Sequence, residues 1–165
     1  MDLDQTVMVA GIGCRSGVST EQVESALESA VEAAEAALRN MTPAERVLTA
    51  IATPATKSHE PGIIAVAASR GIALVLISQA DLEAANPATL THSEHSMAAM
   101  NVHSVAEAAA LAGAGPTARL LGPRIVTGPV TCALAYAVIH ARAGMPASTA
   151  TDAAAPTPNH ATNTP

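Results

Sequence analysis

Hydrophobic and polar residues alternate along the chain in blocks that predict strands and helices in turn. Residues 6–11 (TVMVAG) form a short apolar run rich in β-branched side chains, which is typical of a strand. The glycine-rich segment GIGCRSG follows, and apolar residues then recur every third or fourth position up to about Asn40, as in an amphipathic helix. Ser19 and Gln22 have the spacing of a capping box, so this helix is expected to begin there.

A second strand and helix follow in the same order. Residues 47–52 (VLTAIA) predict the strand, and Pro61 predicts a helix that begins at the proline and runs to about Arg70. Gly71 is expected to end this helix. The run IALVLIS (72–78) is apolar throughout, which is typical of a strand covered on both faces.

The next part of the chain predicts two further helices separated by an irregular stretch. Ser78 can cap a short helix through the backbone of Asp81. Residues 86–102 show no clear period and are expected to be irregular. Ser104 and Glu107 then have the spacing of a second capping box, S-V-A-E, at the start of an alanine-rich helix.

The alternation of strands and helices predicts an α/β fold. We expect three layers, with a mostly parallel sheet of about five strands covered by helices on both faces. Residues 118–121 and 130–138 are the last expected strands, and an antiparallel arrangement of this closing pair is one possibility. The domain is expected to span residues 1–144, followed by an Ala/Thr/Pro-rich tail (145–165) that lacks apolar periodicity and is predicted to be disordered.

Composition and charge exclude several classes of function. The chain is 49% hydrophobic, but it has no Phe or Trp and Tyr136 is its single tyrosine. With 8 basic against 14 acidic residues, it offers neither a stacking platform nor a basic patch for nucleic acid. No apolar run reaches the roughly 18 residues of a membrane span and no signal peptide is evident, so a soluble cytoplasmic protein without membrane contact is expected. In that compartment Cys14 and Cys132 are expected to be free thiols.

Four fragments occur in an order that points to a known family. Together they resemble the cobalamin-biosynthesis family that contains the stand-alone protein CobE and the C-terminal domain of CbiG. The resemblance covers about residues 7–141. The fragments are GIGCRSG, IATPATKSHEPGIIAVAASRGIAL, SEH with SVAEAAAL, and PVTCALA.

The resemblance implies a place in the construction of the corrin ring, with a precorrin or cobalt-precorrin as the ligand. It implies no cofactor of the protein's own, because cobalt would arrive only within the ring. CbiG is the hydrolase that opens a ring lactone and releases acetaldehyde, so a precorrin lactone hydrolase is one alternative. Because the chain starts directly with the C-terminal domain, the resemblance favours CobE of the aerobic branch. A non-catalytic partner of another pathway enzyme is the third alternative.

The glycine-rich turn is the first candidate ligand site. A strand that leads through GIGCRSG into a capped helix gathers backbone N–H groups and the positive end of the helix dipole, which favours an anion. Arg15 adds a fork-shaped donor suited to the carboxylates of a corrin precursor. We therefore take Gly11, Gly13, Cys14 and Arg15 as candidate ligand-binding residues. The segment lacks the third glycine of a dinucleotide-binding loop, and a plain connecting turn with a packed Cys14 is the alternative.

The segment after the second strand is the second candidate site. Lys57 and Glu60 follow that strand, where open α/β sheets tend to bind ligands. Lys57 can pair with a ring carboxylate. Glu60 can cap its helix, orient Lys57, or act as an acid or base, which makes it the candidate catalytic residue. A surface lysine and an ordinary capping glutamate are the alternative interpretation.

The remaining candidates rest mainly on the resemblance. Ser104, Glu107 and Thr131 are included as ligand-binding residues, although a capping box alone explains the first two and packing the third. His92 and His95 have a spacing that can place both on one helical face. A zinc site needs three or four ligands and no third is suitably spaced, so no metal site is predicted.

Overall fold

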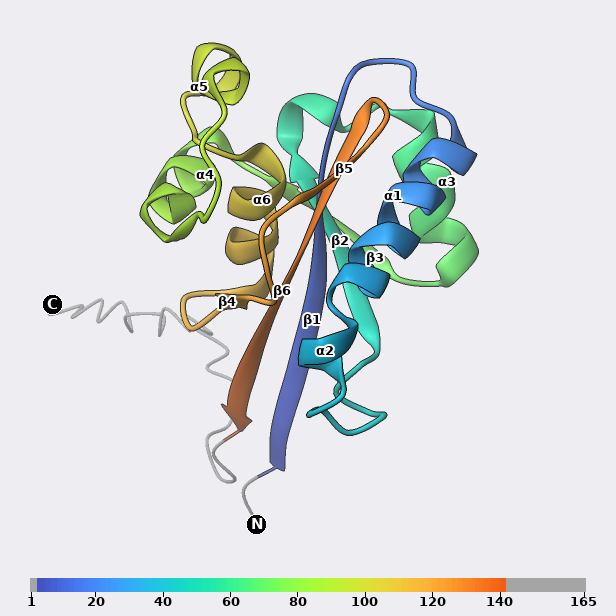
Figure 1. Ribbon diagram of the computed structural model, residues 1–165, viewed down its shortest axis with the longest axis vertical. Coiled ribbons are helices and arrows are strands. Elements are labelled where there is room, and N and C mark those ends of the chain that lie inside the picture. The colour runs from blue at the N-terminus through green and yellow to red at the C-terminus, as the bar shows by residue number, and fades with distance from the viewer. Residues whose placement is uncertain (1–2, 142–165) are drawn as a thin grey trace, which may run out of the picture.

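Strands from both halves of the chain form one open sheet with helices on both faces (Figure 1). The computed structural model describes residues 3–141, and within them the sheet has six strands in the order β3-β2-β1-β6-β4, with β5 also paired to β6. β1, β2 and β3 run parallel, whereas β6 is antiparallel to β1, β4 and β5. The strands are β1 (Leu3–Cys14), β2 (Leu48–Pro54), β3 (Ala73–Ile77), β4 (Arg119–Leu120), β5 (Ile125–Thr127) and β6 (Val130–Ala141).

Helices lie on both sides of this sheet, three on each. α1 (Thr20–Ala33), α2 (Glu35–Leu38) and α3 (Pro61–Arg70) lie on one face. α4 (Gln79–Ala85), α5 (Glu94–Met100) and α6 (Val105–Ala114) lie on the other, and two short 3-10 turns, η1 (Ala55–Lys57) and η2 (Asn86–Ala88), complete the described elements. The three-layer α/β fold is confirmed, and the antiparallel part of the sheet extends beyond the closing pair to include β1.

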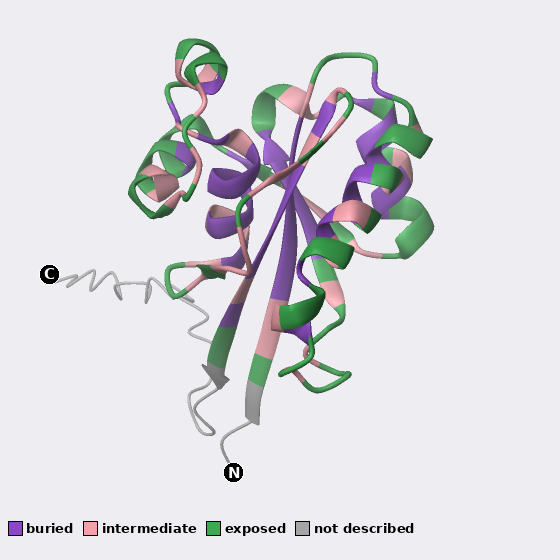
Figure 2. Ribbon diagram, in the orientation of Figure 1, coloured by how far each residue is buried: buried purple, intermediate pink, exposed green. Residues whose placement is uncertain are grey.

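Two hydrophobic clusters, one on each face, follow from the alternation of side chains along β1. Met8, Ala10 and Ile12 point into the cluster beneath α1 and α3, whereas Val9 points into the cluster beneath α6. Gly11 completes the second face, because a Cβ there would lie only 1.9 Å from the Ala106 carbonyl oxygen of α6. The missing side chain lets the backbone of α6 lie directly on β1. Figure 2 shows buried residues gathered along β1, β6 and the helix faces that meet them.

Local signals at three helix ends are confirmed. Ser19 and Gln22 make both hydrogen bonds of the capping box at α1. Ser78 accepts from the Asp81 N–H at the start of α4, and Gly71 ends α3 in the left-handed conformation with φ of 64°. These features depend on neighbours within a few residues, so the sequence alone specifies them.

Three expectations from the sequence are corrected. β3 is only partly covered: α3 and α6 contact it from opposite faces, but it pairs only with β2 at the edge of the sheet, and Leu76 is 46% exposed. Residues 86–102 are not irregular throughout, since they contain η2 and α5. The first long helix is interrupted at Ala34, which divides it into α1 and α2.

Two further expectations concern the C-terminal tail and membrane-spanning helices. The tail at 145–165 lies outside the described residues, so its disorder stays a prediction. Among the helices of residues 3–141, none is both long and apolar enough to cross a membrane.

Candidate ligand-binding cleft

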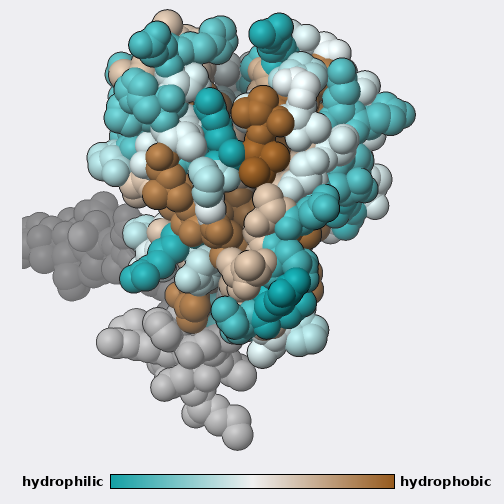
Figure 3. All heavy atoms as spheres, in the orientation of Figure 1, coloured by the Kyte–Doolittle hydropathy of each residue, from teal (hydrophilic) through white to brown (hydrophobic). Residues whose placement is uncertain are grey.

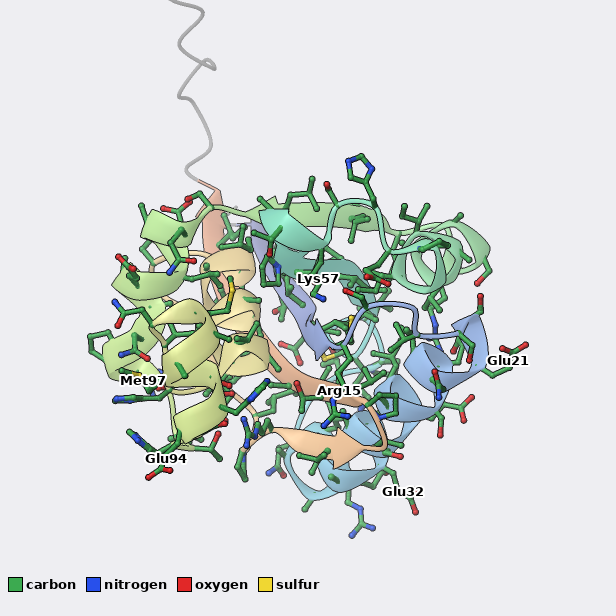
Figure 4. All side chains as sticks on the ribbon, turned by 90° about the horizontal axis from the view of Figure 1, so that it is seen from above. Arg15, Glu21, Glu32, Lys57, Glu94 and Met97 are labelled. Carbon is green, nitrogen blue, oxygen red and sulfur yellow. The ribbon has the colours of Figure 1, made fainter. Side chains whose placement is uncertain are left out.

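A cleft of about 660 Å³ opens at the end of the sheet where β1 and β2 terminate. It is lined by the turn after β1, the segment after β2, helix α5 and the region around the β5–β6 hairpin. Seen from above, Arg15 and Lys57 lie in the middle of this end, between α5 on one side and α1 and α3 on the other (Figure 4). This is the edge of the sheet at which open α/β folds usually bind ligands.

Hydrogen bonds hold the turn that carries Arg15. β1 extends as far as Cys14 because it pairs with β6, where Val130 lies opposite Cys14. The Arg15 N–H then donates to the Pro129 carbonyl over 3.3 Å. Gly17 has φ of 83°, a left-handed conformation that favours glycine and turns the chain toward α1. Arg15 is exposed, so its guanidinium is accessible at the mouth of the cleft.

Lys57 reaches the same place from the next strand. It ends η1, directly after β2, and its Nζ donates to the Ser16 Oγ over 3.3 Å. β1 and β2 are parallel neighbours, so the segments that follow them leave the sheet at one edge. The structure therefore brings Arg15 and Lys57 to one cleft, as the order of the strands predicts.

Glu60 contacts the turn after β1 but does not line the cleft. It is buried, and its Oε2 accepts the N–H of Gly17 over 3.1 Å. Although Glu60 occupies the N-cap position of α3, its side chain makes no capping hydrogen bond, which corrects the expected capping role. The carboxylate instead ties the turn after β1 to the start of α3.

Cys14 lines the cleft as a half-buried free thiol. Burial raises the pKa of Cys14 above its ordinary value; nearby Lys57 lowers it and the negative charge of Glu60 adds to the rise. The neutral thiol is therefore favoured at neutral pH, which is unlike an activated nucleophile. Cys132 is also free but lies in the core, where burial raises its pKa to about 12.

Of the remaining candidates, Gly13 and Thr131 line the cleft, and the Thr131 hydroxyl donates to the Gly13 carbonyl over 3.2 Å. Gly11, Ser104 and Glu107 do not line it. Gly11 lies beneath α6, and Ser104 Oγ accepts the Glu107 N–H over 3.4 Å at the start of α6.

The second capping box is only half formed, which corrects the sequence prediction. The Glu107 carboxylate does not return to the backbone of Ser104 but accepts hydrogen bonds from Leu90, Thr91 and Arg124. A fully buried carboxylate needs several donors, and two neighbouring loops supply more of them than one helix end can.

Sequence reasoning missed several residues of the cleft, above all Arg124 and His95. Arg124 lies in a loop with no distinctive local pattern. His95 belongs to the SEH fragment, which was the one available signal. His92 does not line the cleft; its ring lies 4.4 Å from that of His103, centroid to centroid. No group of three potential metal ligands occurs within residues 3–141.

The charges around the cleft favour an anionic ligand. Arg15, Lys57 and Arg124 line it, and no Asp or Glu of the described residues does so. The acidic residues labelled in Figure 4, Glu21, Glu32 and Glu94, lie at the outer edge of that view, away from the two labelled cations. A chain of net charge −6 thus carries a locally basic cleft, which can attract and orient an anion.

Apolar surface adjoins these charges. Val105 and Val126 line the cleft together with Ala99 and Met100, and Val126 is 60% exposed. Figure 3 shows hydrophobic side chains gathered over β5 and the strands beside it, between more hydrophilic α4 and α5 on one side and α1 on the other. The cleft therefore offers cations for acidic groups and apolar contacts for a ring.

Comparisons with known proteins agree on one family. The family model described as cobalamin synthesis G C-terminus matches residues 8–135. Protein CobE of Sinorhizobium sp is 34% identical over 128 residues, which is 78% of this chain and 79% of the relative.

Two crystal structures extend this similarity to the fold. One is of CobE, a protein from the cobalamin (vitamin B12) biosynthetic pathway, with a TM-score of 0.69 and 32% identity over 83% of this chain and 94% of that one. The other is of the cobalamin biosynthesis protein chiG from Agrobacterium tumefaciens, with a TM-score of 0.60 and 35% identity over 78% of this chain and 97% of that one. The chain therefore belongs to the cobalamin-biosynthesis family of CobE and the C-terminal domain of CbiG.

Proposed function

We propose that the cleft binds a precorrin or cobalt-precorrin intermediate of cobalamin biosynthesis through the carboxylates at the rim of the ring. The observation that supports this most directly is the convergence of Arg15, Lys57 and Arg124, from three separate segments, on one cleft without a lining carboxylate. Corrin precursors carry acetate and propionate side chains around a largely apolar macrocycle. Cations at the edge and apolar residues between them match that pattern.

The size of the cleft fits a ligand of this class. Ligand pockets usually measure about 300 to 1,000 Å³, and this cleft has about 660 Å³. In our proposal Arg15 and Lys57 hold carboxylates at one side of the ring and Arg124 holds one at the other. Residues 13–16 and Thr131 also line the cleft, and in the proposal their backbone and hydroxyl groups contribute polar contacts.

Binding without chemistry is the form of the function that the geometry favours. The Glu60 carboxylate accepts a hydrogen bond from Gly17 and does not line the cleft, and the pKa of Cys14 is raised rather than lowered. In the proposal Glu60 shapes the turn that presents Arg15, and the protein holds or hands on an intermediate. The lactone hydrolase and the non-catalytic partner remain as outcomes of the test.

The test is a titration of the purified protein with cobyrinic acid, a stable corrin polycarboxylate, followed by its visible absorption. The fully esterified form of the same compound is the matched control, because it keeps the ring and loses the negative charges. We expect saturable binding of the acid that weakens as salt rises and much weaker binding of the ester.

Two other results would count against the proposal. Equal binding of acid and ester would remove the role of the cations, and no binding of either would favour the partner hypothesis. Release of acetaldehyde from a lactone-bearing precorrin, catalysed by the protein, would show a hydrolase instead.

A further inference from the structure

We propose that Glu107, although it does not touch the cleft, is a positioning residue that sets the place of Arg124 and of α5 on the far side of the ligand. The inference rests on the proposed function, because ligand affinity is one of its readouts. It also makes a claim about the ligand-free protein that can be tested separately.

Glu107 lies on α6 and its side chain is fully buried. All hydrogen-bond donors to its carboxylate come from two other segments of the chain. Oε1 accepts the backbone N–H groups of Leu90, over 2.5 Å, and of Thr91, over 3.0 Å. Oε2 accepts the Thr91 hydroxyl and, over 3.2 Å, the backbone N–H of Arg124. Both oxygens are thus engaged by neutral donors, which a fully buried carboxylate needs.

The two segments held by Glu107 form one side of the cleft. Arg124 lines the cleft itself. Thr91 lies two residues before Ser93, the N-cap of α5, and α5 supplies Ser96, Met100 and other lining residues. The Glu107 side chain therefore connects the segment of Arg124 to the segment that leads into α5.

Helix α5 depends on such polar contacts more than on packing. Ser96 is its one buried residue among the seven of the helix. Hydrogen bonds hold its ends: the Ser93 N–H donates to the His103 carbonyl over 2.8 Å, and the Gln79 side chain donates to the Met100 carbonyl over 2.6 Å. Loss of the Glu107 contacts would leave this wall with little apolar burial to keep its place.

The opposite side of the cleft is independent of Glu107. Arg15 and Lys57 directly follow β1 and β2, whose register is fixed by strand pairing. Lys57 can therefore serve as the control for a residue that Glu107 does not position.

Glu107 forms two tethers, the hydrogen bonds to residues 90–91 and the hydrogen bond to Arg124. The change Glu107→Gln distinguishes them, because only one atom of the amide can accept. Its single amide oxygen is expected to stay at the Oε1 position, where two backbone N–H groups need an acceptor. The NH2 group then faces the Thr91 hydroxyl, which can rotate to accept, and the Arg124 N–H, which cannot. The variant should keep the tether of residues 90–91 and lose the tether of Arg124.

The first measurement needs no ligand. Amide hydrogen exchange of Glu107→Gln should be faster than wild type at Arg124 and nearly unchanged at Leu90 and Thr91. Unchanged protection of Arg124 would overturn the proposed tether.

The second measurement is a pair of double-mutant cycles on the affinity for cobyrinic acid. Arg124→Ala is expected to weaken binding about tenfold, and adding Glu107→Gln to it should cost no more than about twofold more. When Glu107→Gln is combined with Lys57→Ala, the fold losses of affinity caused by the two changes should multiply. A general loss of stability would act alike in both cycles, so equal multiplication in both would overturn the positioning role.

Thr91→Val keeps the experiment informative if Glu107→Gln does not fold. It removes the hydroxyl that helps to hold Oε2 and leaves the carboxylate intact, so we expect a smaller loss of affinity that shrinks in the Arg124→Ala background to the part due to α5. A loss that is undiminished there would contradict the inference. Failure of the wild type to bind cobyrinic acid would refute the proposed function, whereas the exchange measurement would still decide the role of Glu107.

Discussion

The contact between β1 and α6 can be tested with a single methyl group, by the change Gly11→Ala. The new Cβ would lie 1.9 Å from the carbonyl oxygen of Ala106 and 2.5 Å from the backbone nitrogen of Ala110. Ordinary contact begins at 3.4 Å, and both atoms belong to the backbone of a packed helix rather than to a flexible side chain. α6 would have to move away from the sheet by more than 1 Å to make room, as the difference between 3.4 and 1.9 Å requires.

The expected loss of stability follows from this clash. Overpacking of a core typically costs about 1 to 3 kcal/mol. Because α6 must shift as a whole, we expect at least the upper value, about 3 kcal/mol in the free energy of unfolding. For a protein of this size that corresponds to a fall in Tm of roughly 6 to 12 °C.

Urea unfolding followed by circular dichroism measures this loss, together with a thermal scan. Gly122→Ala is the matched control, because a Cβ at Gly122 has no atom within 4 Å; its effect should stay within about 0.5 kcal/mol. If Gly11→Ala unfolded at the midpoint of the wild type, the direct packing of α6 on β1 would be refuted.

Three further predictions concern Cys14 and the tail. Cys14→Ala should keep complementation of cobalamin synthesis, because the thiol is not activated; complete loss with the fold preserved would make Cys14 catalytic. Burial raises the pKa of the Cys14 thiol, and the thiolate is the reactive form, so its alkylation by iodoacetamide should be slow at pH 7 and still accelerate above pH 9; a rate that levels off near neutral pH would contradict the raised pKa. Deletion of the residues after Met145 should leave Tm unchanged, and a large fall would show that the tail docks on the domain.

The parts of the fold that the sequence predicts are those with local causes. The caps at Ser19 and Ser78 and the left-handed Gly71 each depend on a few neighbouring residues, and all three are present. The place of β3 in the sheet depends on the order of the strands, so its continuous apolar run led us to expect a more complete cover than an edge strand has. An edge strand can be as apolar as a central one when a helix covers part of it, as α3 and α6 do here.

The residues of the candidate site also divide into those that the sequence predicts and those that it does not. Arg15 and Lys57 could be predicted because parallel strands end at one edge of a sheet. Arg124 and His95 reach the cleft through loops and a short helix whose paths the sequence does not specify. Glu107 matches a local capping pattern, but donors from distant loops outcompete the nearby backbone for its carboxylate.

The most direct test of the central claim is the dissociation constant of cobyrinic acid for variants that each lose one positive charge. Lys57→Ala and Arg15→Ala remove cations that line the cleft, whereas Arg39→Ala removes an exposed cation at the end of α2. A charge-assisted hydrogen bond contributes about 1.5 to 3 kcal/mol, so the two cleft variants should each bind roughly tenfold more weakly or worse. Arg39→Ala should stay within about twofold of the wild type, with unchanged circular dichroism in all three. Wild-type affinity in both cleft variants, or an equal loss in all three, would contradict a carboxylate-binding cleft at this edge of the sheet.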